Sequence, residues 1–348
     1  MSRKRVKLGI SKITVIVLII VVVIIALIGG TLVFYHSSSS SIKTTQSSIV
    51  PISTTPVTIG ALQGNDPDIS AWAFTESQLL STLKEYDPNI KTQDFSTATL
   101  VIQGLESGTI QVGIISTDSI IVAISRGAPL VIVATYRITP AARDLVVKAS
   151  TPINNLYQLN NTDDAEPSPG ILPTITDEYL EYKYNLHFNF EYVGSFQGQI
   201  AALISDKATF ANVNPFDAYK LIQNGTLKVV YSFSLKWPAY SVVTTRSFLE
   251  QHPDAIKAVI MGLLKANDIY EANVNNQTIN FLASYYGRII GSNGAVVLFH
   301  NYTYSTNGAI NVTALQILIN TYREIGVITN STLTVNDTYT NEFVKVIS

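Results

Sequence analysis

The sequence is poor in the residues that form redox-active or strongly nucleophilic sites. Its 348 residues include no cysteine and only four histidines. The absence of cysteine excludes disulfide scaffolds, thiolate zinc sites, iron–sulfur clusters and cysteine nucleophiles. It leaves the redox compartment open, because an exported protein can also lack cysteine.

The four histidines do not form a site of their own. His36 adjoins the apolar N-terminal stretch, His252 precedes a proline, and His187 and His300 are isolated. None has another histidine or an acidic residue at metal-ligand spacing. The nucleophile elbow, the HExxH helix, the Walker A loop and a GxGxxG turn after a strand are also missing. We therefore predict that the protein is not an enzyme and that it binds no cofactor and no metal.

Charged residues are scarce, at 14% of the chain, and their signs are unevenly distributed. Five basic residues occur within the first twelve positions: Arg3, Lys4, Arg5, Lys7 and Lys12. Removing these five positive charges takes the net charge from −2 to about −7 for the remainder. A net-acidic body argues against nucleic acid as a partner. Hydrophobic residues, at 47%, are enough for a packed core, and the length is that of about two domains.

An uncharged apolar stretch follows the basic cluster. Residues 13–35 contain no charged side chain, and 13–28 are almost wholly Val, Ile, Leu and Ala. About 20 such residues span the hydrocarbon core of a bilayer. The positive-inside rule then places residues 1–12 in the cytoplasm and everything after Tyr35 outside. We therefore predict a single-pass anchor in the cell membrane at 13–35, with an extracellular body.

Two other interpretations of this stretch were weighed. A buried core helix is disfavoured, because few soluble helices are apolar on all sides over this length. A cleaved secretory signal stays open, although the apolar run is long for one and no A-x-A site follows. Residues 7–11 resemble archaeal pilin-like signal sequences, which are cut after a glycine, here Gly9, and keep the hydrophobic helix. The helix is expected to be retained in either case.

A stretch rich in hydroxyl side chains comes next. Residues 36–56 are mostly serine and threonine and predict a flexible stalk. Seven N-x-S/T sequons beyond it predict a glycosylated, exported body. The sequons begin at Asn160, Asn224, Asn276, Asn301, Asn311, Asn330 and Asn336. Anchor, stalk and body together describe a protein tethered to the outer face of a membrane.

The body alternates between predicted strands and helices, and part of it occurs twice. A helix, strand, helix and strand occur in that order at 102–136 and again at 200–233. Continuous apolar strands alternating with helices predict parallel sheets covered on both faces. In each copy an aspartate, Asp118 or Asp217, lies in the first turn of the helix after the strand, where it interacts favourably with the helix N-terminus.

The last third of the chain changes character and becomes mainly helical. Ser247 is the expected cap of a long amphipathic helix that runs to about Ala272. Further helices are predicted near 276–290, 312–325 and 337–347. Helices that follow the last strand can pack back onto the first lobe.

The chain is therefore predicted to cross between two lobes twice, near 145–149 and 234–240. Lobe 1 is predicted to comprise residues 57–147 and 235–348, and lobe 2 residues 148–234. Two crossings form a hinge with one main degree of freedom, which favours opening and closing of the lobes.

Three stretches, in this order along the chain, resemble the solute-binding proteins of ABC importers. The first has a glycine-rich spacing that ends in Pro-Leu: Gly108, Gly113, Gly127, Pro129 and Leu130. The second is the helix–strand–helix run at 198–225. The third opens the long helix: Arg246, Phe248, Leu249, Pro253, Ile256, Lys257 and Ala258. The resemblance covers about residues 57–290. One departure lies at 206–212 (DKATFAN). The G-x-x-D-A pattern that is usual there lacks both its glycine and its aspartate.

The resemblance is to the type II periplasmic-binding fold, in the group that includes alkanesulfonate, taurine, nitrate and thiamine-pyrimidine (NMT1-like) binders. The anchor and stalk resemble the archaeal, membrane-anchored form of these proteins. This implies an α/β protein with two doubly wound sheets joined by a two-crossing hinge, after an N-terminal transmembrane helix. It also implies three partners: a small-molecule ligand, an ABC permease and the ATPase subunit of that permease.

Candidate ligand contacts follow from strand-end chemistry. Ligands of open α/β sheets bind beyond the carboxyl ends of the strands. Loops that precede helices offer free N–H groups to an anion, aromatic side chains can wall a ring, and an arginine can make a bidentate contact. The predicted contacts are Gln63, Trp72, Ser116, Thr117, Arg137, Ser168, Phe196, Gln197, Asn214, Phe216 and Trp237. For each aromatic taken singly, core or surface packing is the better explanation. Ion pairing explains the arginine, and turn formation the asparagine, equally well.

Two other functions remain as alternatives. A surface adhesion or pilus-associated subunit is indicated by the pilin-like leader, but the long two-lobe body and the stalk disfavour it. Filaments that contain this chain would reverse that ranking. A sensor ectodomain would need a separate signalling partner, because only residues 1–12 are predicted to lie inside the cell.

Overall fold

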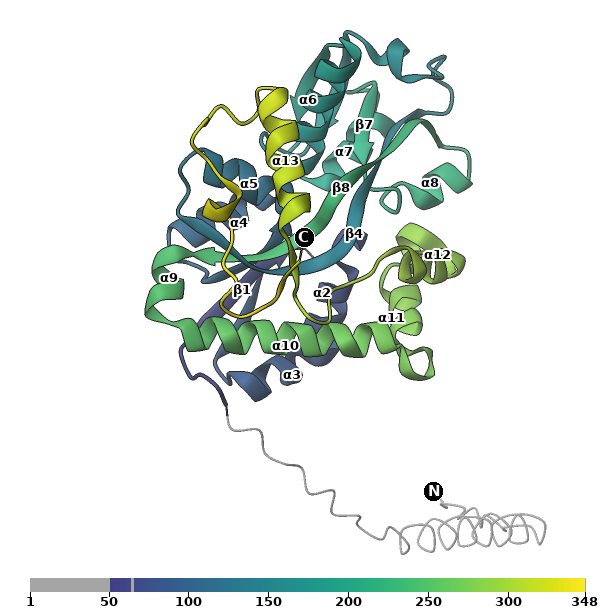
Figure 1. The fold of residues 1–348 in the computed structure, drawn as a ribbon. Coiled ribbons are helices and arrows are strands. Elements are labelled where there is room, and N and C mark those ends of the chain that lie inside the picture. Colours follow the sequence, from purple (N-terminus) through teal and green to yellow (C-terminus); the bar gives the residue numbers. More distant parts are fainter. Residues whose placement is uncertain (1–50, 64–65, 348) are drawn as a thin grey trace, which may run out of the picture. The chain divides into compact units, whose positions relative to one another are not determined.

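A computed structural model of the chain describes residues 51–63 and 66–347 (Figure 1). These residues belong to one unit of the chain, Ile49–Ser348. The predicted cytoplasmic segment at 1–12 and the predicted anchor at 13–35 lie outside the described residues. Within the described ranges, no helix combines the length and the apolar character needed to cross a bilayer.

The end of the predicted stalk lies against the body. The backbone N–H groups of Ile52 and Ser53 both donate to the carbonyl oxygen of Tyr86, at 2.9 and 3.3 Å. Ser53 is buried. Tyr86 is the last residue of helix α3 (Leu80–Tyr86), so the chain is fixed to the body shortly before the first strand begins.

Eight strands form one mixed sheet, in the order β2-β1-β3-β8-β4-β7-β5-β6. Their bounds are β1 (Val57–Leu62), β2 (Ile90–Phe95), β3 (Val112–Ser116), β4 (Leu130–Lys148), β5 (Thr162–Glu166), β6 (Phe188–Tyr192), β7 (Phe210–Val213) and β8 (Leu227–Thr245). We call the parallel group β2-β1-β3 the first half of the sheet and the parallel group β7-β5-β6 the second half. The prediction of two separate sheets is therefore wrong, because the two halves are hydrogen-bonded into one.

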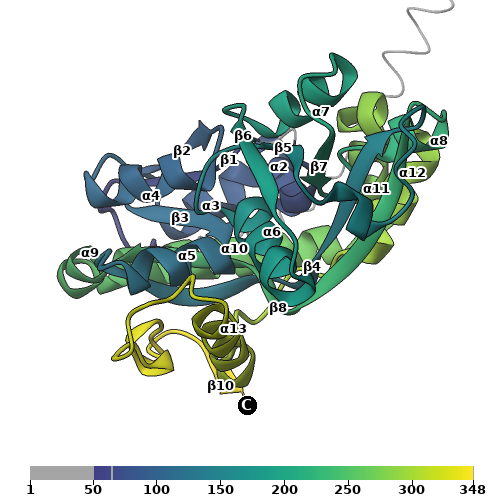
Figure 2. The same cartoon turned by 90° about the horizontal axis from the view of Figure 1, so that it is seen from above.

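Two long strands join the halves. β4 and β8 are 19 residues each, and they run side by side in an antiparallel pair (Figures 1 and 2). Their register shifts several times between Ile132 and Ala142, and Pro140 faces Pro238 in the middle. A proline has no N–H to give to the ladder. The crossings predicted near 145–149 and 234–240 fall at the end of β4 and within β8.

The helices of the first half pack as a doubly wound sheet requires. α4 (Ala98–Glu106) contacts β1 and β3, and α5 (Thr117–Ser125) contacts β4 and β8. The predicted long helix is interrupted at His252, which separates α9 (Arg246–Gln251) from α10 (Pro253–Ala272). Pro253 cannot continue the hydrogen bonding of α9. Thr245, and not Ser247, caps α9 by accepting from the N–H of Phe248.

In the second half, α6 (Leu172–Tyr184) contacts β7, and α7 (Phe196–Ile204) contacts β5 and β7. Short α8 (Tyr219–Gln223) precedes β8. The remaining predicted helices form as α11 (Gln277–Tyr285), α12 (Gly287–Asn301) and α13 (Val312–Glu324).

The helix predicted at 337–347 is wrong. A single 3-10 turn at Val335–Asp337 is followed by extended chain and by β10 (Val346–Ile347), which pairs with β9 (Ile310–Asn311). The N–H of Thr340 donates to the carbonyl of Ile132 in β4. Thr338, Thr340 and Asn341 have side chains that compete with helical hydrogen bonding, so this segment pairs with existing strands instead.

The apolar core is divided unequally between the two halves. One large cluster of buried side chains covers the first half and includes Ile59, Ile114 and Val131. The second half has two smaller clusters, one around Ala165 and Val213 and the other around Leu180 and Phe210.

Candidate functional site

Two buried arginines on β4 connect loops and strands of both halves. Arg137 Nη1 donates to the Asp68 carboxylate (2.5 Å) and to the Asp68 carbonyl (2.9 Å). Arg143 Nη1 lies 3.7 Å from the other oxygen of the same carboxylate. Arg143 also donates to the side chain (2.8 Å) and the carbonyl (2.6 Å) of Asn212 in β7. Because Asp68 follows β1, this chain of contacts ties the first half to the second.

Tyrosines enclose the Arg137 guanidinium. It lies 4.0 Å from the ring centre of Tyr302 and 5.1 Å from that of Tyr240, both within cation–π range. The hydroxyl of Tyr304 donates to the same Asp68 carbonyl at 3.1 Å. Among the residues that the structure describes, Arg137 Nε and Nη2 have no hydrogen-bond partner. The cation is thus held mainly by one carboxylate and aromatic faces.

The acidic groups of this region are perturbed by burial. Burial, and then the negative charge of Asp68, raises the pKa of Asp66 to about 7. Burial, with the charges of Asp66 and Asp68, also raises the pKa of Asp217 well above its usual range. Burial alone would lower the pKa of Arg137, but Asp68 and the surrounding tyrosines raise it. Arg137 therefore stays charged, while the acids around it are poised to take up protons.

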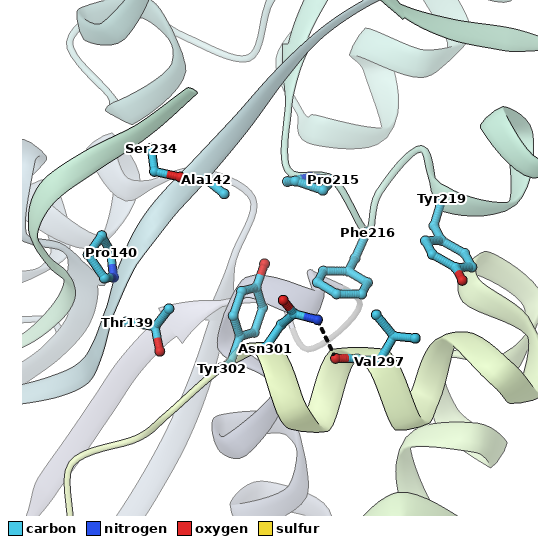
Figure 3. A pocket seen from close by; sticks show the side chains of 10 residues that line it. All are labelled: Thr139, Pro140, Ala142, Pro215, Phe216, Tyr219, Ser234, Val297, Asn301 and Tyr302. Carbon is cyan, nitrogen blue, oxygen red and sulfur yellow. Dashed lines mark hydrogen bonds between the residues drawn. The ribbon is translucent and has the colours of Figure 1, made fainter. Parts of the chain in front are cut away.

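A pocket of about 400 Å³ opens beside this cluster (Figure 3). Its walls come from β4 and β8, the loop after β7, α8 and the end of α12. The lining residues are Thr139, Pro140, Ala142, Pro215, Phe216, Tyr219, Ser234, Val297, Asn301 and Tyr302. All ten side chains are uncharged, and the polar ones are hydroxyls and one amide. This composition fits a small ring or another neutral ligand with a few hydrogen-bonding atoms.

The Tyr302 ring forms the wall between the pocket and Arg137. Its hydroxyl donates to Asn214 Oδ1 at 3.0 Å, and its ring meets Phe216 edge-on with centroids 5.3 Å apart. The N–H of Phe216 donates to the same Asn214 oxygen at 2.8 Å. Asn214 Nδ2 is buried and has no partner among the described residues. Asn214 thus fixes both aromatic walls of the pocket.

Three of the predicted ligand contacts meet at this site: Arg137, Asn214 and Phe216. Phe216 lines the pocket itself. Arg137 and Asn214 lie behind its wall, each with an unpartnered side-chain nitrogen. Both side chains also have structural roles: Arg137 forms an ion pair with Asp68, and Asn214 accepts the hydrogen bond of a turn from Phe216.

A second group of predicted contacts surrounds the start of α5. Trp237 Nε1 donates to both oxygens of the Asp118 carboxylate at 3.0 Å, and the hydroxyl of Tyr322 donates to it too. Asp118 lies in the first turn of α5, as predicted. Burial raises its pKa to about 6, although the Tyr322 and Trp237 hydrogen bonds act to lower it.

Ser116 and Thr117, at the same strand end, bond within the protein. Ser116 Oγ donates to Ser119 Oγ at 2.7 Å, and Thr117 Oγ1 lies 2.8 Å from Ser241 Oγ. Both predicted residues are buried. A ligand could use their hydroxyls only by exchanging these bonds.

The remaining predicted contacts are dispersed. Ser168 Oγ lies 3.3 Å from Thr99 Oγ1 of α4, which is a direct contact between the loop after β5 and the first half. Phe196 packs against the large core cluster, and Gln63 and Gln197 are exposed. Trp72 is fully buried in the same core. Ligand contact by these residues stays a prediction.

The sequence did not single out Asp66, Asp68, Arg143 or Tyr302. Asp66 and Asp68 lie in the loop after the first predicted strand. Two acidic residues at the carboxyl end of a strand could have indicated a site there. Arg143 lies within a segment read as the end of one lobe. Tyr302 comes from a helical region whose position relative to the sheet no local pattern reveals.

Comparison with known proteins assigns the chain to a family. A family model described as NMT1/THI5 like matches residues 90–273, more than half of the chain. No curated protein matches the chain by sequence.

Solved structures share the fold at low sequence identity. The CA3427 gene product of Candida albicans, described as having the generic periplasmic binding protein fold, is 14% identical, with 84% of this chain and 98% of that one covered and a TM-score of 0.71. The alkanesulfonate-binding protein SsuA of Xanthomonas axonopodis pv. citri, bound to MOPS, is 13% identical (82% and 98% covered, TM-score 0.66). The nitrate-binding protein NrtA of Synechocystis PCC 6803 is 13% identical (82% and 86%, TM-score 0.65). The predicted periplasmic-binding fold is thereby confirmed.

Proposed function

We propose that this chain, which belongs to the NMT1/THI5-like family, is not an enzyme but a membrane-tethered receptor of an ABC importer. It captures a small ligand outside the cell and presents it to a permease that is driven by an ATPase subunit. The tether is the apolar stretch at 13–35.

The observation that carries the proposal is the uncharged, aromatic-walled pocket of Figure 3. Phe216, Tyr219 and Tyr302 offer flat faces, and Thr139, Ser234 and Asn301 offer donors and acceptors. The guanidinium behind the Tyr302 ring, that of Arg137, is fully buried and bonded to Asp68. These features favour a heteroaromatic ligand, such as a thiamine-like pyrimidine, over a sulfonate or nitrate, whose full charge would meet no cationic side chain among the lining residues.

Ligand binding is coupled to the arrangement of the two halves. The pocket is bounded by the loop after β7 on one side and by Val297–Tyr302 on the other, with the β4–β8 pair between them. A ligand that contacts both sides stabilises the arrangement in which they are close, by its differential affinity for that arrangement. Ser116, Thr117, Ser168, Gln197 and Trp237 remain proposed contacts of the same closed arrangement.

The extracellular location is supported by the seven sequons. None of their asparagines is buried in the structure. Asn301 is exposed and also lines the pocket, so a glycan there would stand at the pocket entrance. Mass measurement before and after glycosidase treatment tests occupancy. Protease shaving of intact cells tests the location, since cleavage in the Ser/Thr-rich stretch would release the body.

A ligand panel tests the binding function. The full-length chain, kept in detergent because of its apolar N-terminal run, is heated with thiamine pyrimidine precursors, sulfonates, nitrate and small carboxylates in turn. At a ligand concentration 100-fold above Kd, the stabilisation is about 2.7 kcal/mol. We expect a selective rise with a pyrimidine. A rise with a sulfonate or nitrate alone would keep the receptor and overturn the ligand class.

Two variants localise the effect. Tyr219→Ala removes one aromatic wall and is expected to weaken the ligand-dependent rise. Tyr182→Ala removes a tyrosine that is 55% exposed on α6, away from this pocket, and should leave the rise unchanged. No rise with any compound, together with no co-purified ligand in native mass spectrometry, would contradict the proposed function.

A further inference from the structure

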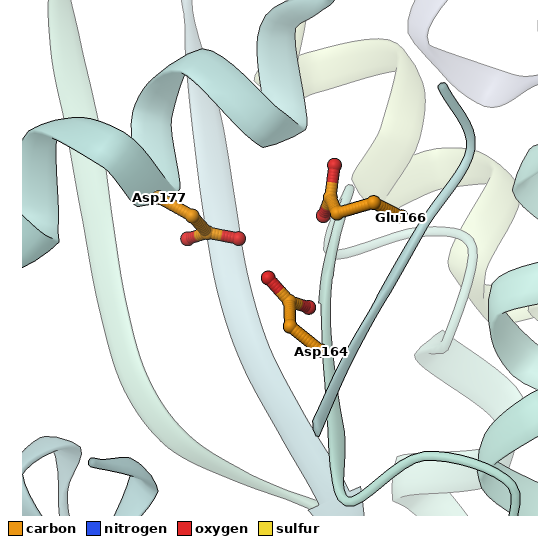
Figure 4. Close-up of side chains that lie close together, drawn as sticks. All are labelled: Asp164, Glu166 and Asp177. Atoms are coloured by element: carbon orange, nitrogen blue, oxygen red, sulfur yellow. The ribbon is translucent and has the colours of Figure 1, made fainter. Parts of the chain in front are cut away.

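Three carboxylates gather in the second half of the sheet, away from the pocket of Figure 3. Asp164 and Glu166 are two residues apart on β5 and therefore point to the same face. Asp177, from α6, meets them there (Figure 4). One carboxylate oxygen from each lies within 4.8 Å of the others. All three side chains are fully buried.

The cluster has too few donors for its charge. Thr174 Oγ1 donates to Glu166 at 2.6 Å, and Asn212 Nδ2 donates to Asp177 at 2.9 Å. In the part of the chain that the structure describes, no salt bridge reaches any of the three acids. Arg143 acts on Glu166 and Asp177 through space, but its own contacts are with Asp68 and Asn212. Buried carboxylates without a paired cation are costly unless they bind a proton or a metal ion.

A second observation points to a ligand rather than to packing alone. The Asp164 carboxylate is directed toward Asp177 with Glu166 alongside (Figure 4), and neither of its oxygens has a hydrogen-bond partner among the described residues. Asp177 Oδ2 lacks one too. Gln199 is also fully buried. Its Nε2 donates to the carbonyls of Ala165 (2.9 Å) and Asn212 (3.1 Å) and lies 3.5 Å from Glu166 Oε1, so it adds only one weak donor to the cluster. Several oxygens with free lone pairs therefore remain in or beside the cluster.

We propose that Asp164, Glu166 and Asp177 form a binding site for one Ca²⁺ ion. Carboxylate and amide oxygens are the ligands that Ca²⁺ prefers, at 2.3–2.6 Å, and the set contains no nitrogen or sulfur that would favour zinc or copper. Mg²⁺ gives up its waters reluctantly, which disfavours it in a fully buried site. The ion would link β5 to α6 and so fix the intervening loop, which carries Ser168.

This site was not predictable from spacing. Asp177 is eleven positions beyond Glu166, and only the packing of α6 over β5 brings them together. The prediction that the protein binds no metal considered histidines and motif spacings, which do not describe an all-carboxylate site assembled by tertiary structure.

Calcium binding to the full-length chain in detergent tests the proposal. After treatment with EGTA and dialysis, titration calorimetry with CaCl₂ should show one bound ion per chain, and saturating Ca²⁺ should raise Tm by about 5 °C. Equal MgCl₂ should raise it less. Asp164→Asn and Asp177→Asn should each weaken binding by at least about tenfold. Asp163→Asn, which changes the exposed neighbour on the same strand, should bind Ca²⁺ like the unaltered chain.

Clear outcomes would overturn the proposal. The absence of both bound Ca²⁺ and a change in Tm for the unaltered chain overturns it. Greater stability of the chain with Asp164→Asn would then show that the acids share a proton. Equal Ca²⁺ binding by the chain with Asp163→Asn and the chain with Asp164→Asn would place the ion elsewhere. Far-UV circular dichroism confirms that each variant is folded, and the titration of the unaltered chain decides the question even if one is not. Ligand binding at the pocket is scored separately, by the compound panel.

Discussion

β1 and β5 occupy equivalent places in the two halves of the sheet, yet they are built from opposite kinds of residue. Each pairs in parallel with two neighbours, β1 with β2 and β3, and β5 with β6 and β7. Counted from the first pair of each ladder, Ile59 and Ala61 correspond to Asp164 and Glu166. All four side chains are fully buried.

The difference shows that the same strand pairing can carry either a core or a polar site. In the first half, the buried side chains of β1 belong to one large apolar cluster. In the second half, Ala165 points to one small cluster while its neighbours Asp164 and Glu166 present carboxylates toward α6. The second half therefore relies on polar contacts where the first relies on apolar burial, and the two respond differently to the same substitution.

The largest expected effect comes from placing an acid in the first half. Ile59→Asp removes a buried apolar side chain and adds an unpaired carboxylate, so we expect a loss of about 5 kcal/mol or more in the free energy of unfolding. Denaturant unfolding measured by circular dichroism gives the value. The matched variant in the second half, Asp164→Asn, removes one buried charge and should lose far less. Equal losses of unfolding free energy would show that β1 and β5 contribute to stability in the same way despite their different side chains.

The link between the halves ranks next. Arg137→Met leaves the Asp68 carboxylate buried without its closest cation, which is expected to cost about 3–5 kcal/mol. Lys148→Met is the control, because it breaks the exposed Lys148–Asp206 pair and should cost less than about 1 kcal/mol. Similar small losses in both denaturation curves would mean that the central ion pair does not hold the halves together.

Asp118 gives the first half a pH dependence of its own. Its pKa is about 6 in the folded chain and near 3.8 unfolded. Below pH 4 the group is protonated in both states and has no effect. As pH rises from 4 to 6, the unfolded chain loses the proton first, so the stability falls by up to about 3 kcal/mol. Asp118→Asn should lack this fall. The difference between the two unfolding curves at each pH isolates the group, and parallel curves would contradict the assignment.

The smallest effect is expected at Thr99, whose hydroxyl contacts the loop after β5 in the other half. Thr99→Ala removes the contact between Thr99 Oγ1 and Ser168 Oγ, both partly exposed. The expected loss is under about 1 kcal/mol. Hydrogen exchange should become faster in the loop after β5, while β1 keeps its protection. Unchanged exchange in that loop would show that the contact does not restrain it.

Local patterns predicted the parts of the fold that depend on local chemistry. The alternation of strands and helices, the strands at 57–62 and 90–95, and the acid in the first turn of α5 all follow from side-chain periodicity and helix electrostatics, and the structure confirms them. The family resemblance, drawn from three motifs in order, is confirmed by the match over residues 90–273.

Features that depend on tertiary contacts were missed. The length of β4 and β8 is one such feature: the sequence predicts crossings near 145–149 and 234–240, but not that two strands of 19 residues pair there. Asp177 joins Asp164 and Glu166 only because α6 packs over β5, and Tyr302 reaches Arg137 from a helix that follows the whole sheet in sequence. The 337–347 segment does not form the predicted helix, because it pairs with β4. Its partners there lie some 200 residues earlier, where no local pattern reveals them.

The pairing of Pro140 with Pro238 has a mechanical consequence. At that point neither strand has an N–H to donate to the other, so the sheet has a line of low bending stiffness between its two stiff halves. Bending along this line breaks no main-chain bond donated by either proline. The resistance to such bending therefore comes from side chains around this line, above all Arg137, so a substitution there is expected to change how far the sheet flexes as well as how stable it is.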